Sequence, residues 1–347
     1  IFHKKVYFKM IKLNISAIVF FLFLIGCKEN YKGGILDSSN FIRYIVNFNQ
    51  NDNELYSQYV PNDSAFQFLS ENIPLIEIPD KDIEETYYFR WWTFRKHIKS
   101  TEDGFVVTEF LPNVPWSGKH NTINCPAGHQ VYEGRWLRDS KYISDYINFW
   151  LYKAGDGIRQ YSFWIADATF AFYKVHKNDS LLKNQLEPLL SNYEHWEKIR
   201  RDTSNILFWQ NNNNEGMEFS ASGRILNSGV PISGVPAISP SMNSYMYGDA
   251  KAIAGIAKLA NNQTLSQSFE SRAFLIKKEV QNRLWNKKLN FFTVLPKTFN
   301  ETKDPVDVRE LIGYTPWYFN LPDDKIIYSD AWNKVMDSTG FYAPYGL

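Results

Sequence analysis

The chain has 347 residues, of which 44% are hydrophobic and 22% are charged, and its formal net charge is +1. This composition is typical of a globular protein with enough apolar material for one large domain or two smaller ones, and the near-neutral charge gives no electrostatic basis for binding nucleic acid. Aromatic residues form 17% of the chain; such rings either fill a large helical core or stack on the apolar faces of sugars.

The first residues have the pattern of a bacterial lipoprotein signal. A lysine and then a short apolar run, residues 15–25, follow Met10. The run is too short to span a membrane as a helix, but it has the length of a signal-peptide core. It ends in Leu-Ile-Gly-Cys at residues 24–27, which resembles a lipobox, the motif whose cysteine receives a lipid. We therefore expect an exported lipoprotein, anchored to a membrane through Cys27, in the periplasm or at the cell surface.

Three regions follow from this interpretation. Residues 1–27 are predicted to be upstream residues and a signal peptide, residues 28–40 a polar tether, and residues 41–347 the folded domain. Apart from Cys27, the sequence contains one cysteine, Cys125, so no disulfide framework is expected.

Helical periodicity dominates the folded domain. Residues 41–48 are apolar at helical spacing, and residues 84–98 are aromatic almost all round, which is typical of a helix buried on most sides. Residues 105–111 alternate well enough for a short strand. Five later helices are predicted from apolar residues at helical spacing, beginning near residues 143, 163, 180, 241 and 266, with Ser180, Ser241 and Ser266 as N-caps. Between the helices we expect loops without strong strand pairs, so the pattern indicates a large all-α domain built of antiparallel helix pairs.

The longest connection, residues 205–224, contains the strongest candidate for catalysis. It carries Glu215 and Glu218 beside aromatic residues, and loops of this length are usually functional or disordered. The aromatic residues argue against disorder. A carboxyl group held near apolar side chains has a raised pKa and can act as a general acid near neutral pH, which makes Glu218 the candidate. The alternative is that Glu218 caps a turn or pairs with Arg224.

Two further segments combine groups that can bind hydroxyls. Residues 133–139 (EGRWLRD) bring Trp136, Arg138 and Asp139 together before a predicted helix. Arginine forks and carboxylates recognise hydroxyl groups well, although a solvated ion-pair patch would have the same sequence. The second segment starts the next predicted helix and contains Arg159, Gln160 and Trp164, while Asn243 opens a later one; both signals are weak on their own.

Several motif classes are absent. The sequence has no glycine-rich phosphate loop, Walker motif, GxSxG elbow or HExxH pair, which argues against nucleotide-binding proteins, serine hydrolases and zincins. His120, Cys125 and His129 are loosely spaced and match no zinc pattern. We therefore predict neither a metal nor another cofactor.

Read in order, these blocks resemble the six-hairpin (α/α)6 glycosidases of glycoside hydrolase family 63, with trehalases and mannosylglycerate hydrolases as relatives. The resemblance covers roughly residues 85–347. The blocks that carry it are residues 136–143 (WLRDSKYI), 159–182, 215–220 (EGMEFS), 241–261, 284–292 (LWNKKLNFF) and 312–322 (IGYTPWYFNLP).

The resemblance implies a fold, a reaction and a set of site residues. The fold is an all-α (α/α)6 toroid with a short β-containing segment near its N-terminus. The reaction is inverting hydrolysis of an α-linked oligosaccharide or a glycan derived from a polysaccharide. Glu218 stands where the family has an aspartate as general acid, and Glu215 is assigned to substrate binding or support. The residues expected to bind substrate, besides Glu215, are Trp136, Arg138, Asp139, Arg159, Gln160, Trp164, Asn243 and Trp317.

The family's general base is a glutamate late in the chain, after the segment resembling GFYAPYGL, at which this sequence ends. The resemblance therefore implies a toroid that lacks its last helices and the base, and a fragment that is inactive by itself. Two alternatives stay open. One is a catalytically silent glycan-binding lipoprotein on the same scaffold. The other is a sugar epimerase or isomerase, which requires a histidine pair that the sequence does not show.

Overall fold

The computed structural model describes residues 36–204, 206–226, 235–297 and 304–345. The predicted signal peptide and Cys27 lie outside the described residues, so both stay predictions. Helices dominate this part of the chain: α2 (Ile42–Gln50), α3 (Ala65–Asn72), α4 (Lys81–Lys96), α5 (Ala127–Gly134), α6 (Lys141–Tyr152), α7 (Ile165–His176), α8 (Asp179–Arg200), α9 (Ala221–Leu226), α10 (Pro240–Leu259), α11 (Gln263–Arg283), α12 (Thr315–Tyr318) and α13 (Ile326–Ser329). None of the described helices is both long and apolar enough to cross a membrane.

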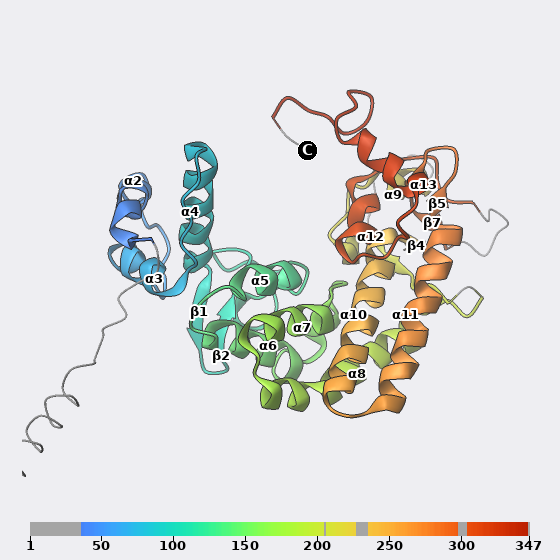
Figure 1. Cartoon of the computed structure of the whole chain (residues 1–347), viewed down its shortest axis with the longest axis horizontal. Helices are drawn as coiled ribbons and strands as arrows, with labels where there is room; N and C mark the ends of the chain where they lie inside the picture. Colours follow the sequence, from blue (N-terminus) through green and yellow to red (C-terminus); the bar gives the residue numbers. More distant parts are fainter. Residues whose placement is uncertain (1–35, 205, 227–234, 298–303, 346–347) are drawn as a thin grey trace, which may run out of the picture.

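The helices form two layers along an arc. Helix α7 packs against α5, α8 and α10, and α10 also packs against α11 and α12. Helix α10 has buried side chains on every side, whereas the buried residues of α11 are Ser266, Phe269, Ala273, Ile276 and Val280, which share one face. Helix α10 therefore belongs to the inner layer and α11 to the outer layer. Figure 1 shows the arc running from α4 at one end to α12 and α13 at the other.

The helix starts differ from the predicted ones in a consistent way. Helix α10 is capped by Ser239, whose hydroxyl accepts a hydrogen bond from the Met242 backbone N–H, and Pro240 follows at the first helical position. Asn178 and Asn262 cap α8 and α11 in the same manner. The predicted N-caps Ser180, Ser241 and Ser266 are therefore wrong, because each lies inside the helix that a preceding side chain already caps.

Short strands occur in several of the connections between helices. Strands β1 (Ile98–Thr101) and β2 (Gly104–Val107) form an antiparallel hairpin, in which Gly104 adopts a φ of +100° that favours glycine. The predicted strand at 105–111 thus starts earlier and ends at Val107. Strands β3 (Gln210–Asn211), β4 (Pro236–Ile238) and β7 (Leu295–Pro296) form one small sheet, and β5 (Trp285–Asn286) pairs with β6 (Phe291–Phe292). The strands of these two sheets are only two or three residues long, in keeping with the prediction of loops without strong strand pairs.

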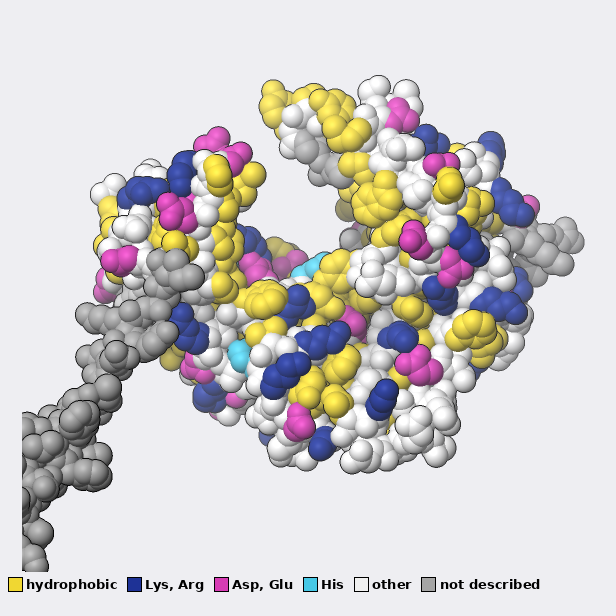
Figure 2. Space-filling model, viewed as in Figure 1, with side chains coloured by type: hydrophobic (Ala, Val, Ile, Leu, Met, Phe, Trp, Pro, Cys, Tyr) yellow, Lys and Arg dark blue, Asp and Glu magenta, His cyan; other side chains and the backbone are white. Residues whose placement is uncertain are grey.

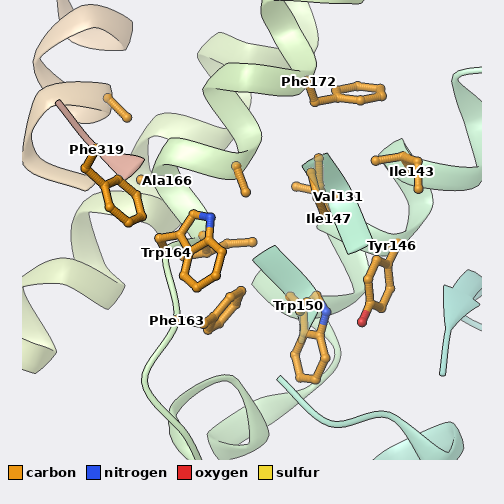
Figure 3. Packing of buried hydrophobic residues seen from close by; sticks show 14 of the residues in the cluster. Val131, Ile143, Tyr146, Ile147, Trp150, Phe163, Trp164, Ala166, Phe172 and Phe319 are labelled. Carbon is orange, nitrogen blue, oxygen red and sulfur yellow. The ribbon is translucent and has the colours of Figure 1, made fainter. Parts of the chain in front are cut away.

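The core between the layers is rich in aromatic rings. Figure 3 shows Trp150 of α6, Phe163 and Trp164 before α7, and Phe319 after α12 among aliphatic side chains such as Val131. Most of the aromatic residues that the composition records are used in this way, and packing of large rings is a major contribution to folding. The arrangement confirms the predicted fold class: the protein is all-α and forms an incomplete (α/α)6 toroid, with small strands at the ends of helices.

Candidate functional site

A cavity in the described part of the chain lies where several helices begin. It has a volume of about 430 Å³. Its lining comes from the first two turns of α5, α7 and α10, or the residue just before them, and from α12 and its neighbours: His129, Trp164, Tyr245, Tyr314, Thr315, Trp317, Tyr318, Phe319 and Trp332. Figure 2 shows that the molecule is broadly hollowed between α4 and the α12–α13 region. Aromatic linings of this kind suit the flat apolar faces of sugar rings.

Trp164 is the central ring of this cavity. Its centroid lies 4.6 Å from that of Tyr245 and 4.7 Å from that of His129. Helix α5 approaches Trp164 closely because residue 128 is glycine; a Cβ atom at Gly128 would lie 2.3 Å from Trp164 Cε2. Trp164 is 2% exposed, and its buried indole Nε1 has no hydrogen-bond partner in the described part of the chain.

The start of α7, and with it Trp164, is fixed by a side chain from α10. The Asp249 carboxylate accepts a hydrogen bond of 2.9 Å from the Asp167 backbone N–H, in the first turn of α7. Burial raises the pKa of Asp249 well above its usual range. Since α7 has no side-chain cap of its own, this contact between helices satisfies its N-terminus. Asp249 lies one turn after Tyr245, so the same stretch of α10 supports both rings.

Glu215 is a buried carboxyl group at the N-terminal end of α10. It ends the short 3-10 helix η5 (Asn212–Glu215), and Gly216 follows with a φ of +72°. Ser239 and Ser241 donate hydrogen bonds of 2.6 Å and 2.9 Å to its two oxygens. Burial raises the pKa of Glu215 to about 7, although these hydrogen bonds oppose the rise. Glu215 therefore changes its protonation state near neutral pH.

Glu218 is partly buried in the same loop. No hydrogen bond or ion pair to its carboxylate occurs among the described residues, so the structure does not show the alternative pairing with Arg224. Burial and then the charges of Glu109, Glu215 and Glu218 raise the pKa of Cys125 to about 12, so all three carboxylates lie close enough to act electrostatically on this thiol. We refer to these three acids as the carboxylate cluster. Burial followed by the charge of Glu218 also raises the pKa of Tyr161.

The carboxylate cluster is connected to the aromatic cavity. Burial raises the pKa of Tyr245, with a further contribution from the charge of Glu215. The loop is held against the segment before α7, since Asn214 Nδ2 donates to the Gln160 carbonyl over 2.9 Å and the Asn214 carbonyl accepts from the Ser162 N–H over 3.0 Å. The structure thus brings together five predicted residues, namely Gln160, Trp164, Glu215, Glu218 and Trp317.

Two predicted substrate ligands are used by the fold instead. Asn243 is fully buried, and its amide donates to the Phe208 and Ser239 carbonyls and accepts from the Phe208 N–H. These hydrogen bonds use the amide nitrogen and oxygen of Asn243. Asn243 therefore attaches the loop that leads to Glu215 and Glu218 to α10, and it does not face the cavity. Arg159 donates to Asp156 and Asn192, which attaches the segment before α7 to α8.

Three further predicted residues lie at the other end of the molecule. Trp136, Arg138 and Asp139 follow α5, and the Arg138 and Asp139 N–H groups donate to Asn72. Trp136 and Arg138 line a shallow cavity with His176, the last residue of α7. Helix α7 has 12 residues, so its last turn is about 18 Å from Trp164 at 1.5 Å per residue. These three residues therefore do not share the cavity with the carboxylates.

The loosely spaced cysteine and histidines also separate. His120 Nε2 lies 2.7 Å from an Asp103 oxygen at the β1–β2 hairpin. Cys125 lies in the carboxylate cluster, and His129 lines the aromatic cavity. Within the described residues the three do not converge on one point.

Sequence reasoning missed most of the cavity lining. His129 entered only the rejected zinc pattern, and the signal at Tyr245 was too weak to predict a site residue. Tyr318 and Phe319 lie next to Trp317 in a run whose aromatic content is visible in the sequence, and that run was the available signal.

The sequence can now be compared with known proteins. The family model of the "Mannosylglycerate hydrolase MGH1-like glycoside hydrolase domain" matches residues 119–347. The chain belongs to this glycoside hydrolase family. The predicted resemblance to six-hairpin glycosidases is thereby confirmed.

Solved structures resemble this family member to different extents. A structure titled "Sialidase" has 39% sequence identity and a TM-score of 0.82 over 90% of this chain, and this chain spans 28% of that protein. A GH63 mannosylglycerate hydrolase from Thermus thermophilus, in complex with Tris, has 8% identity and a TM-score of 0.51, covering 68% of this chain and 74% of that one. An uncharacterized conserved protein from the same organism has 10% identity and a TM-score of 0.52, covering 66% of this chain and 71% of that one. The last two share the fold alone.

Proposed function

We propose that the protein is an exported, lipid-anchored glycosidase that hydrolyses an α-linked oligosaccharide with inversion at the anomeric carbon. The observation that supports this most is the position of the carboxylate cluster around Cys125, next to a cavity lined by aromatic rings. Rings that bind sugar faces and carboxyl groups that move protons are the two components that glycoside hydrolysis needs. The lipid anchor rests on the lipobox resemblance at Cys27.

In this mechanism Glu218 is the general acid. Its carboxyl group gives its proton to the glycosidic oxygen as the bond from that oxygen to the anomeric carbon breaks. A water molecule attacks the opposite face of the sugar and loses a proton to a second carboxylate, for which the resemblance implies a late glutamate. Glu218 suits the first step because no described side chain occupies its carboxylate, whereas Glu215 is held by two serine hydroxyls.

Glu215 then has a supporting role. Its two hydrogen bonds attach the loop to the start of α10, three residues before the proposed acid. The glutamate at position 218 is one methylene longer than the family's aspartate, so the position of its backbone decides whether the proton reaches the substrate. A general acid contributes typically 10²–10⁴-fold to a rate.

The test compares the complete translated protein with its Glu218→Gln variant on a panel of α-linked gluco- and manno-oligosaccharides, with the anomers of the products followed by NMR. We expect the wild type to release sugar of inverted configuration, and the variant to lose about 100-fold or more in kcat while it still binds the sugar. Glu187→Gln is the matched control, because Glu187 is exposed on the outer helix α8.

Each result has a distinct meaning. Equal turnover by Glu218→Gln would remove Glu218 from the acid role, and retained configuration would contradict inversion. Binding of sugar by the wild type without turnover would instead support the silent glycan-binding lipoprotein.

A further inference from the structure

The aromatic cavity contains one imidazole, and neither the resemblance nor the motifs assign it a role. We propose that His129 determines which sugar the cavity accepts, by hydrogen-bonding one hydroxyl group of an uncharged sugar residue. The inference rests on the proposed glycosidase function and names a specificity-determining residue for that same site.

The position of His129 supports this role. It is the third residue of α5 and lines the cavity. Its ring is edge-on to Trp164, with the planes at 85° and the centroids 4.7 Å apart, and its centroid lies 6.2 Å from that of Tyr318. The two aromatic neighbours hold the imidazole in place through its carbon edges and faces, so its orientation is set before a ligand arrives.

The polar atoms of His129 are available. In the described part of the chain neither ring nitrogen makes a hydrogen bond, although the side chain is exposed to the cavity. The ring nitrogens of His129 are therefore free to bind a hydroxyl group of a ligand.

The protonation state decides what the imidazole can recognise. Burial lowers the pKa of His129, so the ring is uncharged at neutral pH. An uncharged imidazole has one nitrogen that donates and one that accepts, in fixed directions on opposite sides of the ring. A sugar hydroxyl group can accept from the N–H or donate to the other nitrogen, so the nitrogen that faces the cavity can bind one hydroxyl group.

The remaining lining explains why selectivity should depend on this residue. Apart from Thr315 the other lining side chains are aromatic, and aromatic faces contact the flat surface of any pyranose in a similar way. Epimeric sugars differ in the direction of one hydroxyl group. A site that hydrogen-bonds a particular hydroxyl rejects analogues that misplace it far more strongly than apolar contact does.

The test uses His129→Phe in the complete protein, since phenylalanine keeps the contacts with Trp164 and Tyr318 but removes both nitrogens. The probes are the methyl α-glycosides of glucose, mannose and galactose, with binding measured by calorimetry and hydrolysis of the corresponding p-nitrophenyl α-glycosides measured in parallel. His195→Phe is the matched control, because His195 is exposed on α8 and does not line the cavity. His129→Asn is a second variant that retains one donor and one acceptor.

We expect the wild type and His195→Phe to prefer one epimer. His129→Phe should lose about 10-fold or more in affinity for that epimer, its ratio between epimers should fall towards one, and its Tm should stay at the wild-type value. His129→Asn should recover part of the preference.

An unchanged epimer ratio in His129→Phe would overturn the inference while the glycosidase function stands. Equal loss for all three sugars with a lowered Tm would assign His129 a packing role and would also overturn it. If the wild type neither binds nor cleaves any sugar of the panel, the proposed function fails and the inference fails with it.

Discussion

Replacing Glu215 with glutamine should remove a pH dependence of stability that this one carboxyl group causes. Burial raises its pKa from 4.5 to about 7. Because the folded-state pKa is raised, the contribution of Glu215 to stability is fully present below pH 4.5 and is lost as the pH rises through about 7. Each pKa unit corresponds to about 1.4 kcal/mol, so ionising Glu215 in the folded protein costs up to about 3 kcal/mol.

The assay is denaturant unfolding of the wild type and Glu215→Gln at intervals from about pH 5 to about 8.5. Between these limits the wild type should lose about 3 kcal/mol more of its free energy of unfolding than the variant. Glutamine can still accept from one serine and donate to the other, so at high pH the variant should be the more stable protein. Asp249 and other buried groups titrate in both proteins and cancel in the difference.

Glu187→Gln controls for the loss of one surface charge, and its pH curve should match that of the wild type. Parallel curves for the wild type and Glu215→Gln would refute the reasoning, because they would mean that Glu215 stays as ionisable in the folded protein as in the unfolded chain.

Three further predictions concern other parts of the molecule. Gly128→Ala should displace Trp164, since the added Cβ would lie 2.3 Å from its ring. The free energy of unfolding should fall by about 1–3 kcal/mol in denaturant unfolding, and most of the sugar affinity should be lost in calorimetry. Full affinity would contradict this prediction. Asn243→Ala should destabilise the protein by about 2–3 kcal/mol because it leaves both backbone groups of Phe208 without partners; a loss below about 0.5 kcal/mol in denaturant unfolding would be too small for that role. Cys27→Ser should shift the protein from the detergent phase to the aqueous phase on phase partitioning of expressing cells, and unchanged partitioning would exclude lipidation at this residue.

The sequence predicted helices such as α6 well because they have one apolar face. Ile143, Ile147 and Trp150 are spaced at helical intervals and are buried in α6, as the pattern required. The N-caps were harder, because serine and asparagine residues cluster before these helices and only the backbone path decides which one is outside the first turn. Ser241, for example, lies inside α10 and donates to Glu215.

The candidate site was predicted only in part, for a physical reason. A helical pattern shows which face is buried, but it does not show at which end of the bundle a given turn lies. Trp136, Arg138 and Asp139 have suitable chemistry, yet they follow the C-terminal end of α5, whereas His129 in its first turn faces the cavity. Asn243 has an amide that could bind a sugar, and only the tertiary structure shows that backbone groups already occupy it.

The cavity is assembled from pieces of chain that are far apart in sequence, from His129 in α5 to Trp332 after α13. Such a cavity exists only when the part of the arc from α5 to α13 has docked, so a sugar that binds there can recognise the folded state alone. A ligand present at about 100 times its Kd would then stabilise the protein by about 2.7 kcal/mol. Thermal-shift screening of a sugar library would therefore find the preferred ligand without any assumption about turnover, and every hit would at the same time report that this part of the scaffold is correctly assembled.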